Sequence, residues 1–261
     1  MESGVWRDLV VAEPPGFRPL TLDLFRPAST GPVPVVAWIH GGAWLFGSSK
    51  RDSPELVGAR LEERILGAGF ALARIGYRLS GEARFPAQLD DVRAAIRWLR
   101  AASGELGLDP ERIAVWGESA GGQLAALAAL TGAGDDAVRS AVIWYGPSNF
   151  LTMAAQSHPE DPDHDAADSP ESLLIGGPVQ QFAREAAAAS PVTYASPAAP
   201  PMLLVHGGDD RIVPAEQSRE LHGLLPNSRL HIVPGAGHCF IGADLEPLVT
   251  EALEFLAVSF R

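Results

Sequence analysis

Short runs of consecutive apolar residues recur along the chain, and amphipathic stretches separate them. Such nearly continuous apolar runs are typical of strands that are buried on both faces of a parallel sheet. The runs that predict buried strands lie at residues 33–39, 70–75, 112–116, 141–145, 202–205 and 229–233. Before them, Val5–Val11 and Arg18–Phe25 alternate in part between apolar and polar residues, and they predict an antiparallel pair at the start of the sheet.

The stretches between the apolar runs carry the signals of helices. From Pro86 onward, apolar residues recur at helical spacing and charged residues occupy the other face. The apolar residues are Leu89, Val92, Ile96 and Leu99, and the charged ones are Asp90, Asp91, Arg93 and Arg97. Further helices are expected at residues 53–66 and 123–130, from Pro214 onward, and at 245–260. This alternation of strands and helices predicts a parallel, doubly wound α/β sheet whose ligands bind beyond the carboxyl ends of the strands.

The alternation stops between Gly146 and Pro201, where Pro, Ser, Asp and Ala dominate and no strand is expected. Segments of this length without regular structure are uncommon in compact domains, and those that occur are usually functional. We therefore expect one domain spanning residues 1–261, with an insertion or lid at about residues 147–200, after the sixth strand.

Composition narrows the classes of function. The 261 residues are 46% hydrophobic, which is enough for a sizeable core, and 32 acidic against 20 basic residues give a net charge of -12. This negative charge disfavours nucleic acid and anionic membranes as partners. Cys239 is the only cysteine, so no intrachain disulfide is expected. The N-terminal residues lack the apolar run of a signal peptide, and no segment has the roughly 18 apolar residues of a membrane helix, so we expect a cytoplasmic location.

The run Gly117-Glu118-Ser119-Ala120-Gly121 fits the pattern G-x-S-x-G and lies between an apolar run and a helix-forming run. A strand that ends in a tight turn and opens a helix is the context in which such a serine becomes a nucleophile. Glycines suit this turn because the serine backbone is held near the left-handed region, where larger neighbours would collide. In a chain with 27 glycines the pattern alone is weak, so Ser119 is a candidate nucleophile that needs partners.

A serine hydroxyl is a weak nucleophile at neutral pH, so it needs a base to accept its proton and a third group to orient that base. Asp209 and Asp210 lie just past one predicted strand, and His238 lies just past the next. The order serine, acid, histidine is the order found in hydrolases with a nucleophile elbow. Ser119, one of the two aspartates and His238 are therefore expected to meet at the carboxyl end of the sheet.

The tetrahedral intermediate of such a reaction also needs hydrogen-bond donors for its oxyanion. Ala120 follows the serine at a helix N-terminus, where backbone N–H groups are unpaired and the helix dipole favours negative charge. The loop His40-Gly41-Gly42-Ala43 follows a predicted strand, and its small residues let the backbone approach a substrate. We expect Gly42, Ala43 and Ala120 to form the oxyanion hole, with Gly41 as an alternative donor.

Together these motifs resemble those of the α/β-hydrolase esterases. The residues that carry the resemblance are His40-Gly41-Gly42-Ala43-Trp44, Gly117 to Gly122, His206 to Pro214 and Gly237-His238. The likeness is greatest to the branch of small carboxylesterases and acetyl- or feruloyl-esterase-like proteins related to the hormone-sensitive-lipase group, and it runs from about residue 20 to residue 260. The chain departs from that group at Ala43, where a third glycine is usual, and it lacks the group's long N-terminal cap.

The resemblance implies an α/β-hydrolase fold with a mostly parallel, eight-stranded twisted sheet and helices on both faces. It implies that the acid is Asp210, four residues before the proline of the D-x-x-V-P pattern, and not Asp209. It also implies a serine carboxylester hydrolase that cleaves a small-molecule ester through an acyl-enzyme and needs no cofactor or metal. The short insertion and the missing cap indicate an open site for short-acyl esters. Two alternatives stay open: an amide or peptide hydrolase on the same fold, such as an arylformamidase or a small exopeptidase, and a ligand-binding relative without catalysis.

Four aromatic residues follow predicted strands closely enough to bind substrate, although ordinary packing would place them there equally well. They are Trp44, Phe46, Tyr145 and Phe150, of which Trp44, Tyr145 and Phe150 are the candidates for substrate binding. His40 and His206 also follow or end predicted strands, and we expect each of them to pack there and to hydrogen-bond its local loop.

The acidic run at residues 158–165 invites the hypothesis of a metal site, since oxygen ligands at alternate positions suit calcium. The glycine and the terminal glutamate of an EF-hand are missing at the required positions, so a solvated acidic loop is expected instead. Glu118, inside the elbow, and Cys239, beside the candidate base, are expected to be local packing residues.

Overall fold

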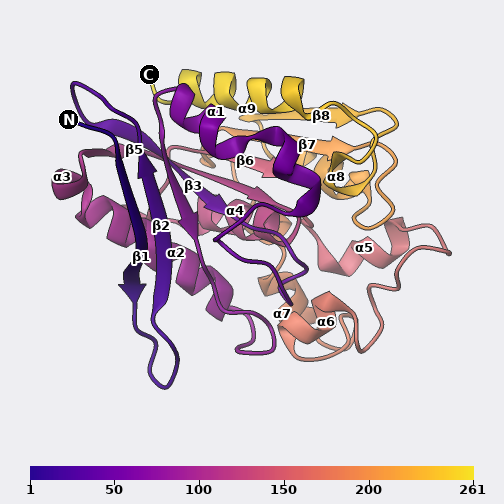
Figure 1. Cartoon of the computed structure of the whole chain (residues 1–261). Helices are drawn as coiled ribbons and strands as arrows, with labels where there is room; N and C mark the ends of the chain where they lie inside the picture. Colours follow the sequence, from indigo (N-terminus) through magenta and orange to yellow (C-terminus); the bar gives the residue numbers. More distant parts are fainter.

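Eight strands form one sheet in the order β1-β2-β4-β3-β5-β6-β7-β8 (Figure 1). The structure is a computed structural model that describes residues 1–261. The strands are β1 (Gly4–Ala12), β2 (Leu20–Arg26), β3 (Val33–Ile39), β4 (Ala71–Ile75), β5 (Leu108–Glu118), β6 (Ser140–Trp144), β7 (Met202–Gly207) and β8 (Ser228–Val233). The pairs β1–β2 and β2–β4 are antiparallel, and every other pair is parallel. The predicted mostly parallel, eight-stranded sheet is therefore confirmed, with its antiparallel strands at the N-terminal edge.

The parallel register aligns the carboxyl ends of the central strands. Every residue of β3 and of β6 is buried, as their apolar runs predict. Ile39 at the end of β3 pairs with Gly117 of β5, and Glu118 of β5 pairs with Trp144 at the end of β6. The segments that follow these strands therefore emerge side by side, at the edge where the sequence places the candidate site residues.

Helices cover both faces of the sheet, as predicted. One face packs against α1 (Leu61–Gly67) and α9 (Leu245–Ser259), and the other packs against α2 (Ala87–Ala101), α4 (Ala120–Thr131) and α8 (Ala215–Leu224) (Figure 1). The single turn α3 (Ser103–Leu106) follows α2. The longest helices, α2 and α9, have 15 residues each, and none of the helices has both the length and the apolar character to cross a membrane.

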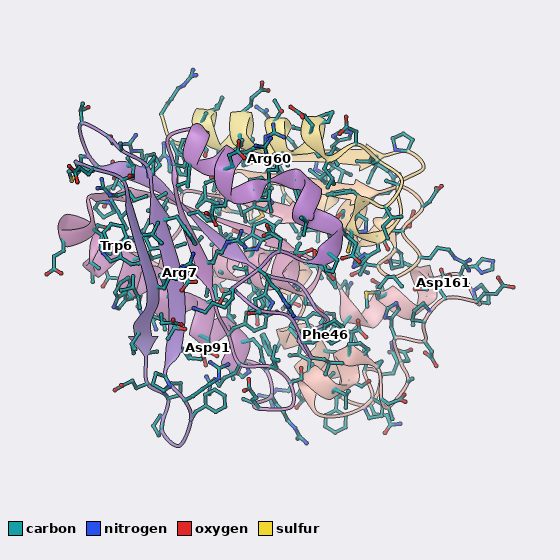
Figure 2. The ribbon with its side chains drawn as sticks, viewed as in Figure 1. Trp6, Arg7, Phe46, Arg60, Asp91 and Asp161 are labelled. Carbon is teal, nitrogen blue, oxygen red and sulfur yellow. The ribbon has the colours of Figure 1, made fainter.

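The helix predicted at residues 53–66 is divided in two. Its first part is a 3₁₀ helix at Pro54–Ala59, and its second part is α1. Arg60 lies between them with a left-handed backbone, φ 49° and ψ 44°, which interrupts the helical path (Figure 2). Because this conformation is unfavourable for a residue with a Cβ atom, packing decides the break. Leu56 and Leu61, on either side of it, are both buried against the sheet.

Asp91 lies on the buried side of α2, and not on the exposed charged face that the helical pattern predicted (Figure 2). Its side chain is only 2% exposed and accepts hydrogen bonds from the backbone N–H and the guanidinium group of Arg78, the shortest at 2.6 Å. The segment after β4 carries Arg78 over this face of α2, which a helical pattern alone does not reveal. The prediction for Asp91 is therefore wrong, whereas its neighbour Asp90 is exposed as expected.

The insertion at residues 147–200 contains short helices and no strand, in agreement with the sequence. They are α5 (Phe150–Gln156), α6 (Pro170–Ile175), α7 (Ala183–Ala188) and a 3₁₀ turn at Pro191–Tyr194. Asn149 caps α5 by accepting a hydrogen bond from the N–H of Leu151, and Ser169 caps α6 by accepting one from the N–H of Ser172. These side-chain caps compensate for the small number of intrahelical bonds in such short helices.

Replacing Asp91 with alanine leaves the Arg78 guanidinium, which is 19% exposed, without its counter-charge. Removing one partner of a buried ion pair is strongly destabilising, so we expect Asp91→Ala to lower the free energy of unfolding by about 3 kcal/mol. Urea denaturation measures this change. Asp90→Ala removes an exposed carboxylate from the adjacent position of α2 and should cost less than about 1 kcal/mol. Equal losses in the two variants would contradict the role given to the Arg78–Asp91 pair.

Candidate active site

Ser119 occupies the sharp turn between β5 and α4. Its backbone has φ 50° and ψ −121°, a conformation that L-residues rarely adopt. A Cβ atom on Gly117 would lie 2.1 Å from the carbonyl oxygen of Gly121, and one on Gly121 would lie 2.2 Å from the carbonyl oxygen of Ile39. Only glycine therefore fits at these two positions, which explains the flanking residues of the motif and holds the Ser119 side chain at the strand end.

Ser119, His238 and Asp210 form a continuous hydrogen-bonded chain. His238 Nε2 lies 3.0 Å from Ser119 Oγ, and His238 Nδ1 lies 2.7 Å from Asp210 Oδ2. The backbone N–H of Asp209 donates to the carbonyl of Ala236, and its side chain is exposed. The structure thus brings together the expected serine and histidine with Asp210, the aspartate that the resemblance implies.

Asp210 is buried, and both of its carboxylate oxygens accept hydrogen bonds. Its Oδ1 accepts hydrogen bonds of 2.9 Å from the backbone N–H groups of Ile212 and Val213. Burial by itself opposes ionisation, but the hydrogen bonds from His206 and His238 outweigh it and hold the pKa of Asp210 well below its usual range. An ionised Asp210 requires a proton on His238 Nδ1, so the Nε2 atom that faces Ser119 is left free to act as a base.

His206 has a part in this arrangement that the sequence did not reveal. It is fully buried at the end of β7, with Nδ1 2.7 Å from Ser218 Oγ and Nε2 2.8 Å from the carbonyl oxygen of Val213. The same Nε2 lies 3.3 Å from Asp210 Oδ2. His206 therefore packs at a strand end as expected, and it also supports the carboxylate that orients His238. Its only sequence signal was its position four residues before Asp210.

His40 is held locally, in line with the expectation for it. Its ring stacks on Tyr77 with centroids 4.4 Å apart, and its Nδ1 lies 2.7 Å from the carbonyl oxygen of Gly41. Burial lowers the pKa of His40 to about 4, so the ring is neutral at physiological pH.

Backbone N–H groups without a partner surround the Ser119 hydroxyl. Gly42, Ala43 and Ala120 donate no hydrogen bond within the protein, and Ala43 and Ala120 border the same cavity as Ser119. Gly42 has a φ of 109°, and a Cβ atom there would lie 2.3 Å from the carbonyl oxygen of Phe46, so this tight turn requires glycine. The alternative donor Gly41 directs its N–H toward Glu118 Oε1 at 3.4 Å, so this group is already engaged.

Glu118 connects three segments of the site. Its side chain is buried; Oε1 faces the Gly41 N–H, and Oε2 accepts a 2.9 Å hydrogen bond from the Tyr145 hydroxyl. Burial raises the pKa of Glu118 above its ordinary value, although both donors oppose this effect. Glu118 thus ties the loop after β3 and the end of β6 to the elbow, a role beyond the local packing that was expected. The sequence signal for this role was the presence of a charged residue, Glu118, in a motif whose other residues are small.

Two cavities share Ser119 in their walls. The smaller, of about 350 Å³, is bordered by Trp44, Pro147, Val213 and residues 162–164, 166 and 168–171 of the insertion. The larger, of about 900 Å³, is bordered by the loop after β3, residues 51–57, His238 and Cys239. Because Ser119 and Ala43 border both cavities, a substrate bound across the serine would extend into each of them.

Of the four aromatic residues that could line the pocket, two are packing residues instead. Tyr145 and Phe150 are fully buried and border neither cavity, because Tyr145 bonds Glu118 and Phe150 packs edge-on against Trp44. Trp44 borders the smaller cavity, and its ring is fixed by a 3.1 Å hydrogen bond that its Nε1–H donates to Gln123 Oε1. Phe46, which is 63% exposed (Figure 2), borders the larger cavity, as its position after a predicted strand allowed.

The acidic run at residues 158–165 is only partly the solvated loop that was expected. Asp163 is exposed, and Asp161 at the outer edge of the insertion pairs with Arg211 at 2.6 Å (Figure 2). His164, in contrast, is 4% exposed and lies with its Nδ1 3.3 Å from Glu171 Oε1. The correction follows from the fold of the insertion, because α6 covers the imidazole and supplies its partner.

Cys239 is partly buried and borders the larger cavity, a position beyond the local packing that was expected. Burial raises the pKa of its thiol to about 12, so the reactive thiolate is scarce at neutral pH.

The raised pKa of Glu118 predicts a pH-dependent stability difference. The folded protein binds this proton more tightly than the unfolded chain, so ionisation of Glu118 costs stability as the pH rises from the ordinary value of 4.5 through the raised value. Glu118→Gln has no such proton, and its free energy of unfolding should therefore increase relative to the wild type between pH 5 and pH 8.

Urea denaturation of both proteins at pH 5 and pH 8 measures this difference. The glutamine side chain can also change the free energy of unfolding by the same amount at both pH values, and that change cancels when the two pH values are compared. Glu105→Gln, at an exposed position, should show no pH-dependent difference. A difference between wild type and Glu118→Gln that stays constant with pH would refute the assignment.

Comparisons with known proteins agree with this geometry. The chain is 33% identical over 211 residues to the probable carboxylic ester hydrolase LipM of Mycobacterium tuberculosis, a match that covers 76% of this chain and 47% of LipM. Esterase LipQ of the same organism is 31% identical over 263 residues, which cover 94% of this chain and 59% of LipQ. This chain thus spans about half the length of the curated relatives that it matches.

Among solved structures, the truncated form of a carbohydrate esterase from gut microbiota superposes with a TM-score of 0.84 at 28% identity, covering 99% of this chain and 96% of that one. An esterase of Thermogutta terrifontis, at 23% identity and a TM-score of 0.70, shares the fold. The BD-FAE family model matches residues 22–225, a segment that contains the elbow, the loop after β3 and Asp210. The chain has the α/β-hydrolase fold and belongs to the BD-FAE family.

Proposed function

We propose that this chain is a serine carboxylester hydrolase that works through an acyl-enzyme. The observation that carries the proposal is the hydrogen-bonded chain from Ser119 through His238 to Asp210, beside three backbone N–H groups that have no partner. Relatives that are named esterases support the same reaction. Because those relatives are about twice as long as the matched region, the cytoplasmic location and the single-domain organisation stay predictions.

The proposed reaction assigns each group a step. His238 accepts the Ser119 proton through Nε2 while the hydroxyl oxygen attacks the ester carbonyl. Ionised Asp210 stabilises the imidazolium that forms. The N–H groups of Gly42, Ala43 and Ala120 bind the oxyanion, and the loss of one such donor typically costs about 3 kcal/mol of transition-state stabilisation. His238 then protonates the leaving alcohol, and water repeats the sequence to release the acid.

The two cavities receive different halves of the substrate in this mechanism. The leaving oxygen must lie within reach of His238 Nε2, since it takes the proton from that atom. His238 borders the larger cavity and not the smaller one. We therefore assign the alcohol to the larger cavity of about 900 Å³ and the acyl group to the smaller one of about 350 Å³.

Removing the nucleophile tests the proposal directly. We expect Ser119→Ala to lower kcat for p-nitrophenyl butyrate by at least about a thousandfold, because the remaining groups provide only oxyanion and binding contributions. It should also lose labelling by a fluorophosphonate probe. Ser196→Ala, at an exposed loop position, serves as the control and should keep both properties.

Wild-type turnover by the Ser119→Ala enzyme would refute the assignment of the nucleophile. A matched p-nitroanilide measures the amide alternative in the same assay, and we expect the ester to react faster.

The size of the smaller cavity predicts a preference for short acyl chains. Residues 162–164, 166 and 168–171 limit the space of about 350 Å³ beyond Ser119, so octanoyl and longer chains have to displace part of the insertion. We expect kcat/KM to be highest for acetyl to butyryl esters and lower by about tenfold or more for octanoyl esters. Extending the alcohol by the same number of carbons should cost less, because the larger cavity receives it. Preferential cleavage of long-chain triglycerides would contradict both assignments.

A further inference from the structure

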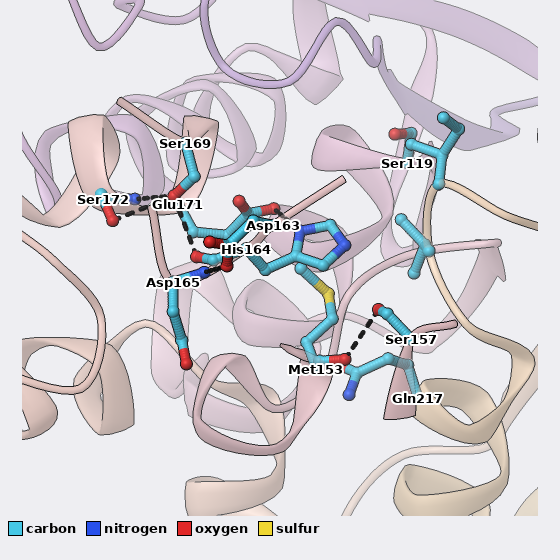
Figure 3. Close-up of polar contacts among 12 residues, drawn as sticks. Ser119, Met153, Ser157, Asp163, His164, Asp165, Ser169, Glu171, Ser172 and Gln217 are labelled. Atoms are coloured by element: carbon cyan, nitrogen blue, oxygen red, sulfur yellow. Dashed lines mark hydrogen bonds and ion pairs between the residues drawn. The ribbon is translucent and has the colours of Figure 1, made fainter. Parts of the chain in front are cut away.

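A buried pair of polar side chains, His164 and Glu171, forms part of the wall of the smaller cavity. Each residue is only 4% exposed. Figure 3 shows the imidazole of His164 on the Ser119 side of Glu171. His164 Nδ1 faces Glu171 Oε1 at 3.3 Å, whereas His164 Nε2 and Glu171 Oε2 have no partner within hydrogen-bond distance in the protein. Buried polar atoms are rarely left unpaired, so atoms of this kind in the wall of a cavity indicate a ligand that bonds them.

The insertion holds this pair in a defined position. Ser169 Oγ donates a 2.9 Å hydrogen bond to the carbonyl oxygen of His164 and accepts one of 3.1 Å from the N–H of Ser172 (Figure 3). Glu171 is in the first turn of α6, between these two anchors. The loop that carries His164 and the helix that carries Glu171 are thus bound together by one serine, so the cavity wall is built before a substrate enters.

The contact between the two side chains decides which atoms remain for a ligand. His164 Nδ1 lies 3.3 Å from Glu171 Oε1, so it carries the proton that faces the carboxylate. Burial opposes protonation of the ring, but Glu171, aided by the backbone carbonyl of Ile212 and the charge of Asp163, outweighs burial and raises the pKa of His164. The atoms left for a ligand are His164 Nε2 and Glu171 Oε2. A hydroxyl group bonds both atoms of a protonated ring and its carboxylate partner, because it donates its hydrogen to the carboxylate oxygen and its oxygen accepts a hydrogen bond from Nε2–H.

The charge of the cavity excludes one class of acyl group. Asp163 and Asp168 border the same cavity as Glu171, and His164 is the only basic side chain in its wall. An acyl group that ends in a carboxylate would meet a surplus of negative charge, whereas a neutral hydroxyl would not.

We propose that His164 and Glu171 select esters whose short acyl group carries a hydroxyl over esters whose acyl group is a plain alkyl chain of the same length. The proposal rests on the proposed esterase function and on the assignment of the acyl group to the smaller cavity. A plain alkyl chain leaves both buried polar atoms unpaired, and sites built to bond a substrate hydroxyl reject analogues that lack it.

The test compares p-nitrophenyl esters that differ only in the acyl group. We expect the wild type to hydrolyse the 3-hydroxybutyrate ester with a kcat/KM about tenfold or more above that for the butyrate ester, as the loss of a hydrogen bond to a charged group implies. The monosuccinate ester should be slower than both. A ratio near one, or a preference for the succinate ester, would overturn the proposal.

Two variants of Glu171 test whether the pair is the cause of the selectivity. Glu171→Leu removes the acceptor, and Glu171→Gln keeps the shape while removing the charge. Each variant should still hydrolyse the butyrate ester, but the ratio of kcat/KM for the 3-hydroxybutyrate ester to that for the butyrate ester should move toward one. The ratio should be closer to one in Glu171→Leu than in Glu171→Gln. Asp165→Asn removes one charge from the same loop outside the cavity wall and should leave the ratio unchanged. An unchanged ratio in either Glu171 variant that shows a cooperative thermal transition would overturn the proposal.

A second pair of substrates tests the acyl assignment. Ethyl butyrate and 2-hydroxyethyl butyrate differ by one hydroxyl in the alcohol group. The Glu171 variants should not alter the ratio of kcat/KM between these two esters. If that ratio changes instead, the pair binds the alcohol and the proposal is overturned. Butyrate turnover by the wild type and its loss in Ser119→Ala report on the esterase function separately, so failure of that function is distinguishable from failure of the selectivity.

Discussion

The parallel pairing of β3 with β5 is the contact on which the rest of the site depends. It sets Ile39 opposite Gly117, and it leaves so little space that a Cβ atom on Gly121 would lie 2.2 Å from the Ile39 carbonyl oxygen. The loop after β3 therefore lies directly against the elbow, and the N–H groups of Gly42 and Ala43 stay without a partner beside Ser119. Sheet hydrogen bonds hold both segments, so donors for an oxyanion are in place before a substrate binds, as electrostatic stabilisation requires.

Three buried carboxylates belong to the site, and the groups around each one give it different properties. Asp210 accepts bonds from two histidines and two backbone N–H groups, so it stays ionised in spite of its burial. Glu118 has only neutral donors in hydrogen-bonding reach, and burial raises its pKa. Glu171 faces a single imidazole and keeps one oxygen without a partner. A buried carboxylate thus orients a base at Asp210, anchors a loop at Glu118 and keeps an oxygen free for a ligand at Glu171, depending on the groups that surround it.

The elements and the site motifs were predictable where the signal was local. The apolar run of β3 has the same bounds in the sequence and in the structure, because a strand buried on both faces excludes polar residues. The predictions failed where distant segments meet. Asp91 is buried because Arg78 lies over it, Arg60 breaks a helix because both of its neighbouring segments pack on the sheet, and Tyr145 is unavailable to substrate because it bonds Glu118. Each failure involves a partner far away in the sequence or a constraint from packing.

The sequence by itself determined the alternation of strands and helices, the turn at Ser119 and the order of Ser119, either Asp209 or Asp210, and His238, because these follow from hydrophobic periodicity and from the steric needs of a short motif. The tertiary structure decided which atoms face one another. It brings His238 into hydrogen-bond distance of Ser119 and Asp210, and it places the Gly41 N–H against Glu118. It also buries His164 beside Glu171, although the sequence around His164 predicts a solvated loop. The physical reason is that burial and hydrogen-bond partners are properties of packing between remote segments, which no local pattern encodes.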